Sequence, residues 1–298
     1  MKVLVTGAAG MLGWDVCADL TARGHEVIGA ALFEEGYLRL DITDTAATQQ
    51  VVRDVRPDAI INCAAWTDVD GAERDATTAY RVNALGAWNL AYAAGESDCW
   101  LLTVSTDFVF DGKRGPNAPP YTEFDETRPL GAYGASKEAG ELLVRETLPR
   151  RHIIARTAWL YGDHGKNFVY TIRRLARERP EVPVVADQIG CPTYTKDLSR
   201  KLIELMENPL PGTYHVCGAG SCSWYEFAQA IVAKSGLSAT VVPITAAEYA
   251  ARFNSPTERP AYSVMRRLAL EMRGMDDLPP WEESLDRCLR ERFPEHGG

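Results

Sequence analysis

The sequence lacks a long apolar segment. No run approaches the ~18 consecutive apolar residues that a membrane-spanning helix needs. Met1 leads directly into an apolar strand pattern, without a charged leader and its apolar stretch. We therefore expect no membrane contact and a location in the cytoplasm.

The chain also lacks the spacings of a disulfide framework or a metal site. Its seven cysteines form an odd set with no C-x-x-C pair, so the patterns of a zinc ribbon and of a small stapled fold are missing. Its five histidines are scattered and form no H-x-x-x-H pair. We expect reduced, mostly buried thiols and no bound metal.

The sequence has fewer basic residues (32 Lys and Arg) than acidic ones (41 Asp and Glu). The net charge of -9 argues against a general surface for nucleic acid or anionic membranes. A local basic pocket for a phosphorylated ligand is still compatible with it. With 298 residues, 46% of them hydrophobic, the chain can bury one large core and is expected to carry a second, smaller lobe.

A glycine-rich segment stands near the start of the chain. Residues 6–13 read TGAAGMLG and follow the apolar run 3–5, a pattern typical of a strand that turns into a helix whose N-terminus receives a pyrophosphate. Gly7, Gly10 and Gly13 depart from the G-x-G-x-x-G spacing, and close packing of helix on strand could also use them without a ligand. Both interpretations stay open at this point.

A tyrosine and a lysine stand four residues apart at Tyr133 and Lys137. Four residues are about one helical turn, so both side chains leave the same face of a helix, where an ammonium beside a phenol favours the phenolate. Taken alone, the pair could equally be a packed tyrosine beside a solvated lysine. Together with a dinucleotide site, it predicts a proton donor for the reduction of a carbonyl.

Strand and helix patterns alternate along the first half, which predicts a Rossmann-type, doubly wound parallel α/β sheet. The expected strands are 2–5, 26–28, 59–61, 100–104 and 152–155, and the expected helices are 11–23, 46–56, 72–95 and 133–147. The strands are almost continuously apolar, as expected where helices cover both faces.

Prolines interrupt the pattern after about residue 156, which predicts a smaller, mixed α/β substrate lobe towards the C-terminus. A helix at 197–207 and a strand at 212–216 are expected to return to the sheet. We therefore predict a cofactor domain of residues 1–156 and 194–217 and a substrate lobe of residues 157–193 and 218–298.

The sequence resembles the extended short-chain dehydrogenase/reductases, and among them the dTDP-4-dehydrorhamnose reductase family. The resemblance covers nearly the whole chain, and several motifs in the right order are more specific than any one of them. These motifs are Gly7-x-x-Gly10-x-x-Gly13, segments 62–70 (NCAAWTDVD), 105–112 (STDFVFDG) and 156–162 (RTAWLYG), Tyr133-x-x-x-Lys137, 187–193 (DQIGCPT) and 259–263 (RPAYS). The family uses the glycine spacing seen here.

The resemblance implies a reduction of the C4 keto group of a dTDP-linked deoxysugar by NADPH or NADH. Tyr133 would protonate the C4 oxygen, Lys137 would lower the pKa of that tyrosine and bind the nicotinamide ribose, and Thr106 would polarise the carbonyl. Ser105 competes for the last role, but strand alternation lets only one of the two face the pocket.

The resemblance also implies the binding residues. For the cofactor they are Gly7, Gly10, Met11, Leu12, Gly13, Asp41, Ile42, Ala64, Ala65, Tyr133 and Lys137. For the nucleotide-sugar they are Thr67, Val69, Asp107, Trp159 and Arg259, the last as a clamp on the diphosphate. Asp41 could also cap the following helix. Members of the family can form a homodimer with a metal between acidic side chains, a site that Asp15 resembles only loosely.

The choice between NADH and NADPH is not decided by the sequence. The acid that would hold a ribose 2′-hydroxyl falls at Ala30-Ala31, and we find no arginine there for a 2′-phosphate. We favour NADPH, with use of both cofactors expected.

Related functions were weighed against this one. A 4,6-dehydratase would carry an Asp-Glu pair after the threonine, whereas Asp107 is followed by Phe108. An epimerase would retain bound NAD, and a binding module resembling the regulatory subunit of methionine adenosyltransferase would need a partner enzyme. A reductase of another nucleotide-linked keto-deoxysugar would share all of these motifs.

Overall fold

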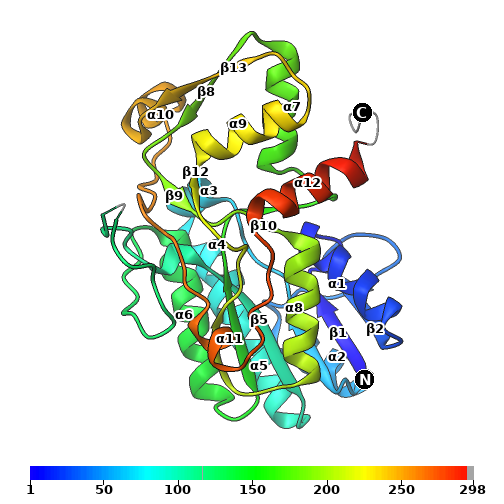
Figure 1. Ribbon diagram of the computed structural model, residues 1–298. Coiled ribbons are helices and arrows are strands. Elements are labelled where there is room, and N and C mark those ends of the chain that lie inside the picture. Colours follow the sequence, from blue (N-terminus) through cyan, green and yellow to red (C-terminus); the bar gives the residue numbers. More distant parts are fainter. Residues whose placement is uncertain (116, 294–298) are drawn as a thin grey trace.

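The computed structural model describes residues 1–115 and 117–293. Its centre is a seven-stranded sheet in the order β11-β6-β5-β4-β1-β2-β3, and all neighbours are parallel (Figure 1). The strands are β1 (Lys2–Thr6), β2 (Glu26–Ala31), β3 (Leu38–Arg39), β4 (Ala59–Asn62), β5 (Trp100–Thr106), β6 (His152–Thr157) and β11 (Gly212–His215). The predicted fold class is confirmed. The edge strand β3 was not predicted.

Helices cover both faces of this sheet. They are α1 (Met11–Ala22), α2 (Thr45–Val55), α5 (Ala87–Glu96), α6 (Ala132–Thr147) and α8 (Thr195–Glu207). Along β1, Val3 and Val5 face the core under α1 and α8, while Leu4 faces the core under α2, α5 and α6. Because both faces of each central strand are buried, the strands read as apolar runs.

The segment 72–95 was predicted to be mostly helical, and it is, although it does not form one continuous helix. It forms α3 (Val69–Arg74), α4 (Ala76–Tyr80) and a π-helical turn (Arg81–Gly86). The break lies at Asp75, whose carboxylate accepts a hydrogen bond from the amide of Thr78 at 3.0 Å and so caps α4.

A second core lies beyond the C-terminal ends of the strands, in the upper part of Figure 1. Its larger elements are α7 (Phe168–Glu178), β8 (Glu181–Val185), α9 (Trp224–Lys234), β13 (Thr240–Ile244) and α12 (Trp281–Arg292). The shorter elements outside the sheet domain are β7 (Leu160–Tyr161), β9 (Ile189–Gly190), β10 (Thr193–Tyr194), β12 (Cys222–Ser223) and α10 (Ala246–Phe253). The short helix α11 (Leu268–Met272) packs against β11 of the sheet domain, and a 3₁₀ turn, Asp107–Val109, directly follows β5. As predicted, α8 and β11 lie in the sheet domain, with β11 paired to β6.

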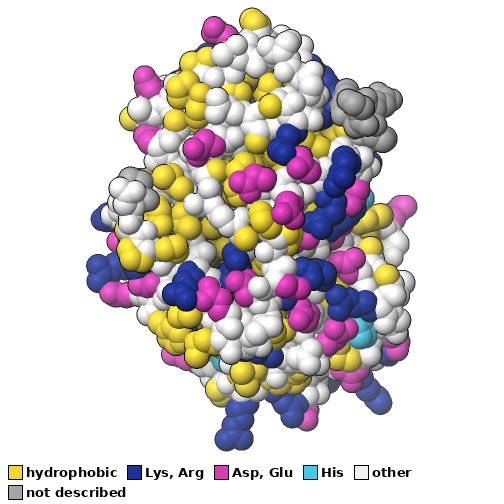
Figure 2. Space-filling model, viewed as in Figure 1, with side chains coloured by type: hydrophobic (Ala, Val, Ile, Leu, Met, Phe, Trp, Pro, Cys, Tyr) yellow, Lys and Arg dark blue, Asp and Glu magenta, His cyan; other side chains and the backbone are white. Residues whose placement is uncertain are grey.

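The surface carries charges of both signs. Figure 2 shows acidic and basic side chains interspersed over the visible face, and many of them form ion pairs such as Lys234 with Asp286. Among residues 1–115 and 117–293, no helix is long and apolar enough to cross a membrane.

Candidate active site

A cleft of about 1210 Å³ lies between the sheet domain and the second core. It is lined by the start of α1, the end of β5 and one face of α6, and on the other side by α7, β8 and α10. The carboxyl ends of parallel strands are where open α/β sheets bind ligands. All predicted catalytic and substrate residues line this cleft, as do Gly10, Met11, Leu12, Gly13 and Ala65 of the predicted cofactor set.

The backbone is closely packed at the glycine turn of residues 7–13. Gly7 has a φ of +68°, and the amide of Gly10 donates to the carbonyl of Gly7 at 3.0 Å. A Cβ atom on Gly13 would lie 2.1 Å from that carbonyl oxygen, and one on Gly7 would lie 2.6 Å from the amide nitrogen of Ala64. The close-packing interpretation of these glycines is therefore confirmed.

The same turn also leaves an anion site. Helix α1 has Gly10 at its N-cap and no side chain bonded to its first amides, and its first turn lines the cleft. The N-terminal amides of a helix attract phosphate groups through their N–H donors and the helix dipole. These features fit the pyrophosphate of a dinucleotide, so packing and binding are compatible uses of the same residues.

Tyr133 and Lys137 leave α6 on the cleft side, as their spacing predicted. The Lys137 ammonium donates to the carbonyl of Val104 at 2.6 Å. Burial lowers the pKa of Lys137 to about 8, in spite of the opposing charge of Glu141. Burial also raises the pKa of Tyr133 to about 12, although a hydrogen bond to Thr106 acts in the other direction.

The expectation that Lys137 lowers the pKa of Tyr133 is wrong for this arrangement. The spacing correctly gave the shared helix face, but it contained no information on burial. Burial penalises the phenolate, and the ammonium is held by a backbone carbonyl of β5. Tyr133 is therefore a protonated phenol over the whole neutral range.

Two neighbouring hydroxyls at the end of β5 have different partners. Ser105 donates to Glu141 at 2.6 Å, and the same carboxylate receives two hydrogen bonds from Arg156 at 2.8 and 2.7 Å. Thr106 instead contacts the carboxylate of Asp107 at 3.1 Å and also bonds with Tyr133. Both residues line the cleft, so the prediction that only one of them would face it is wrong. Their partners distinguish them instead, because Thr106 lies beside the phenol and Ser105 is engaged by the buried ion pair of Glu141 and Arg156.

Asp107 lies under Thr106 and is almost fully buried. Burial raises its pKa to about 6, against hydrogen bonds from Ser263 and Thr106 that lower it. A carboxyl group with this pKa changes its charge just below neutral pH.

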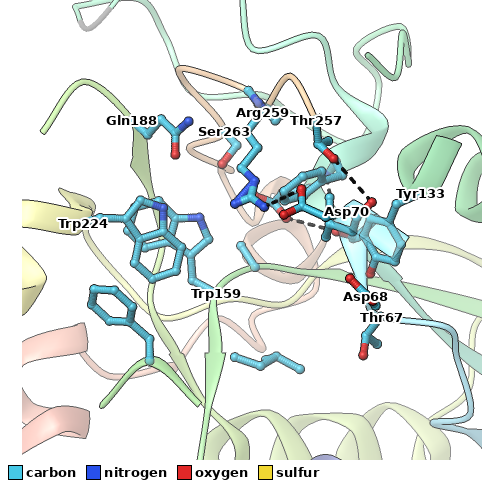
Figure 3. Close-up of a pocket in the computed structure, with 18 of the residues that line it drawn as sticks. Thr67, Asp68, Asp70, Tyr133, Trp159, Gln188, Trp224, Thr257, Arg259 and Ser263 are labelled. Carbon is cyan, nitrogen blue, oxygen red and sulfur yellow. Dashed lines mark hydrogen bonds and ion pairs between the residues drawn. The ribbon is translucent and has the colours of Figure 1, made fainter. Parts of the chain in front are cut away.

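The other predicted substrate residues lie farther along the cleft (Figure 3). Thr67 and Val69 stand at the start of α3, and the Arg259 guanidinium forms an ion pair with Asp70 at 3.0 Å. Trp159 stacks on Trp224 with ring centroids 3.5 Å apart and an interplanar angle of 7°. These two indoles form one wall of the cleft.

Four residues of the predicted cofactor set do not line the cleft: Gly7, Asp41, Ile42 and Ala64. Gly7 and Ala64 meet behind it through their backbones. Ile42 is buried in the core under α2 and α5. Asp41 is exposed and accepts from the amide of Thr43 at 2.9 Å. The alternative role of Asp41 as helix cap is wrong, because Asp44 caps α2.

The structure brings an arginine beside Ala31, although the sequence around Ala30 and Ala31 contains none. The register of the two edge strands pairs Ala31 of β2 with Arg39 of β3. Arg39 is exposed. It lies eight positions beyond Ala31 in sequence and next to it in space, which only the unpredicted strand β3 could reveal.

Several further residues line the cleft that sequence reasoning did not assign. They are Asp68, Asp70, Gln188, Trp224, Ser263 and the face of α10 with Tyr249 and Phe253. Gln188 and Ser263 belong to the motifs 187–193 and 259–263, so the signal was present for them. Trp224 and α10 are brought to the cleft by the second core and carry no local pattern.

The surroundings of Asp15 differ from a metal site. The Lys196 ammonium lies 2.8 Å from Asp163 and 2.6 Å from Glu291. Burial raises the pKa of Asp15. Within the described part of the chain, no three His, Cys, Asp or Glu side chains gather in a way that could hold a metal ion.

Comparisons with known proteins show which family the chain resembles. The family model of the RmlD substrate binding domain matches residues 1–293. The spore coat polysaccharide biosynthesis protein SpsK of Bacillus subtilis is 43% identical over 98% of each chain. The dTDP-4-dehydrorhamnose reductase of Burkholderia thailandensis is 37% identical over 98% of this chain and 99% of its own.

A solved structure is similar along the whole chain. It is that of a dTDP-4-dehydrorhamnose reductase from Bacillus anthracis in complex with NADP. The two chains are 42% identical and superpose with a TM-score of 0.90, covering 97% of this chain and 99% of the other. The cleft described above therefore lies in a scaffold that holds NADP in a relative.

Proposed function

The chain belongs to the RmlD substrate-binding domain family, and from that premise we propose that it reduces dTDP-4-dehydro-L-rhamnose to dTDP-L-rhamnose with NADPH or NADH. The observation that carries the proposal is the meeting of Thr106, Tyr133 and Lys137 in one cleft with the uncapped start of α1. A proton donor beside a dinucleotide site is what the reduction of a carbonyl requires.

Each group of the chain would have its own role in the reaction. The reduced nicotinamide supplies the hydride when it is bound. Tyr133 gives its proton to the C4 oxygen of the sugar, and Thr106 donates a hydrogen bond to the same oxygen. Lys137 holds the ribose hydroxyls, and the first amides of α1 hold the pyrophosphate.

The protonation states support these roles. With a pKa raised to about 12 by burial, Tyr133 is protonated before the reaction and can act as the acid. Lys137, whose pKa burial lowers to about 8, is mostly an ammonium at neutral pH and can donate to the ribose. Asp107 lies next to Thr106 and would contact the sugar.

The outer part of the cleft would hold the nucleotide. Arg259 would bind the diphosphate, since a guanidinium offers several donors to phosphate oxygens. The stacked indoles of Trp159 and Trp224 offer a flat apolar wall for the base or the sugar face. Thr67 and Val69 would contact the sugar from the start of α3.

The test supplies the protein with dTDP-4-dehydro-L-rhamnose and either NADPH or NADH. We expect the absorbance of the reduced cofactor to fall, and dTDP-L-rhamnose to be identified as the product. Tyr133→Phe serves as the matched control, because it removes only the phenolic hydroxyl. No turnover of this substrate, but turnover of another nucleotide-linked keto-deoxysugar, would move the proposal to that sugar.

Three further expectations remain part of the proposal. The first is the division into a cofactor domain (1–156 and 194–217) and a substrate lobe (157–193 and 218–298). The second is a homodimer, to be measured by light scattering. The third is a place in the cytoplasm. A role as a regulatory subunit would instead require a stable partner enzyme and no turnover.

A further inference from the structure

The side chain of Asp70 joins helix α3 to the far side of the cleft. Its carboxylate receives the Arg259 guanidinium at 3.0 Å and the Ser255 hydroxyl at 2.9 Å, and Thr257 bonds to it as well. Figure 3 shows Asp70 and Arg259 facing each other at the edge of the cleft. The two residues are 189 positions apart in sequence.

The pair uses only one edge of the guanidinium. Asp70 binds Nη2 of Arg259, while Nε of Arg259 is buried and has no hydrogen-bond partner within the described residues. A guanidinium is planar, with its donors in a fixed fork, so fixing one nitrogen sets the direction of the others. Arg259 lines the cleft, where its remaining donors can meet an acceptor from outside the chain.

The carboxylate keeps its charge. Burial alone would raise the pKa of Asp70, but hydrogen bonds from Thr257 and Ser255 and the charge of Arg259 outweigh it and lower that pKa. The side chains of Asp70 and Arg259 are 28% and 29% exposed, so the pair is neither fully solvated nor fully buried. An ion pair of this kind contributes little to stability, which leaves orientation as its main effect.

We propose that Asp70 is the positioning residue of Arg259, holding the guanidinium so that its remaining donors face the diphosphate of the nucleotide-sugar. This inference rests on the proposed function. Asp70 brings a negative charge close to a site for an anion, which on charge alone would weaken binding. Its benefit is therefore pre-organisation, because an arginine already held in place loses less conformational freedom when the ligand binds.

A purely structural role for Asp70 makes a different prediction. Ser255 and Thr257 also tie the segment 254–260 to α3, since the Thr257 hydroxyl contacts the carbonyl of Val69 at 3.5 Å. If Asp70 only anchored this segment, Ser255→Ala would have the same effect as Asp70→Ala. The effect of Asp70→Ala would then also persist without Arg259.

The experiment is a double-mutant cycle with Asp70→Ala, Arg259→Ala and the double variant in the full chain. Steady-state kinetics with dTDP-4-dehydro-L-rhamnose and calorimetric titration with dTDP alone are measured for each. We expect Asp70→Ala to raise KM and the Kd of dTDP roughly threefold to tenfold, with kcat and the Kd of NADPH unchanged. Arg259→Ala should raise KM roughly 10- to 150-fold, and adding Asp70→Ala should change it no further.

The outcomes separate the inference from the function on which it rests. An unchanged or lowered KM in Asp70→Ala, additive effects in the double variant, or an equal effect of Ser255→Ala would overturn the positioning role and leave the reductase standing. A wild type that binds dTDP but reduces no dTDP-sugar would end the proposed reaction, while the dTDP titrations would still decide the role of Asp70. A wild type that does neither would overturn both.

A second variant guards against a loss of folding. Asp70→Asn keeps the size and one acceptor oxygen but removes the charge, so it should raise KM less than Asp70→Ala does. Melting curves followed by circular dichroism report the fold of each variant. A KM of Asp70→Asn equal to that of wild type would contradict the need for a charged partner.

Discussion

The two halves of the cleft are built in different ways. The inner half consists of polar groups at the ends of regular elements: the start of α1, Thr106 at the end of β5, and Tyr133 and Lys137 on α6. The outer half includes side chains from α7, β8, α9 and α10 that are mostly apolar, such as Phe168, Trp224 and Tyr249, together with the pair of Asp70 and Arg259. Under the proposed function, chemistry would thus lie on the sheet domain and recognition on the outer half.

The helices of the inner half are also more deeply buried than those of the outer half. Helix α6 buries Ser136, Lys137, Gly140, Glu141 and Val144 against the sheet domain. Helix α10 has no buried residue, and its Phe253 is 53% exposed. Because a site on a well-packed element is held more precisely, mutations in the inner half should act on kcat and those in the outer half on KM.

The largest effect is expected for Tyr133→Phe. It removes the proton donor and leaves the ring in place, so kcat should fall roughly 10²-fold or more. The Kd of NADPH, measured by cofactor fluorescence, should stay near that of wild type. Turnover close to wild type would show that another group delivers the proton. It would also contradict the expectation that mutations in the inner half act on kcat.

The next effect compares the two hydroxyls at the end of β5. Thr106→Val removes a donor beside the phenol and should lower kcat roughly 10- to 100-fold, as expected for one donor to a developing oxyanion. Ser105→Ala should instead act on stability, since it deprives the buried Glu141 of one hydrogen bond. Rates and melting temperatures of both variants decide this, and the reverse ranking in kcat would mean that Ser105 serves the substrate.

The inner half should also respond to pH through Lys137. The ammonium form is the one that can donate, and burial lowers its pKa to about 8. Activity should therefore be present below this pH and fall about tenfold per unit as the pH rises above it. A profile of kcat/KM measured up to about pH 10 tests this. Lys137→Arg retains its charge in this range, so its remaining activity should lack that alkaline limb.

Much of the inner half could be predicted from the sequence because its signals are local. The strand-turn-helix pattern of residues 3–13 and the spacing of Tyr133 and Lys137 each depend on a few neighbouring residues. Burial is not local, which is why the predicted effect of Lys137 on the tyrosine pKa was wrong. The carbonyl of Val104, which holds the ammonium, lies 33 positions away.

The outer half depends on contacts between distant segments. Trp159, between β6 and β7, stacks on Trp224 at the start of α9. Gly190 of β9 permits this, since a Cβ there would lie 2.5 Å from the Trp159 ring. Asp70 meets Arg259 across the cleft. Neither pair has a periodicity or spacing that marks it in the sequence, so only the resemblance to a family could suggest Trp159 and Arg259.

Trp224→Ala tests the outer half directly. It removes one indole of the stacked wall, so the base or sugar would lose an aromatic neighbour, and KM for the dTDP-sugar should rise about tenfold. The Kd of NADPH and the value of kcat should change little. Trp88→Ala is the matched control, because Trp88 is 38% exposed on α5 and lies away from the cleft. A tenfold loss in kcat with unchanged KM would place this wall in the chemical step.

The smallest effect concerns Arg39, which lies outside both halves at the edge of the sheet. The register of β2 and β3 places it beside Ala31, where an arginine can meet the 2′-phosphate of NADPH and where the sequence offers no acid for the 2′-hydroxyl of NADH. Because the side chain is exposed, this charge-assisted contact should contribute only about 1 kcal/mol.

Arg39→Ala should therefore raise the Kd of NADPH roughly fivefold, leave that of NADH unchanged, and weaken the salt dependence of NADPH binding. Fluorescence titration of both cofactors at two salt concentrations measures this, with Arg53→Ala on the exposed face of α2 as the control for a lost positive charge. Equal changes for NADPH and NADH would show that Arg39 does not recognise the phosphate, and the preference between the cofactors would then have to arise within the cleft itself.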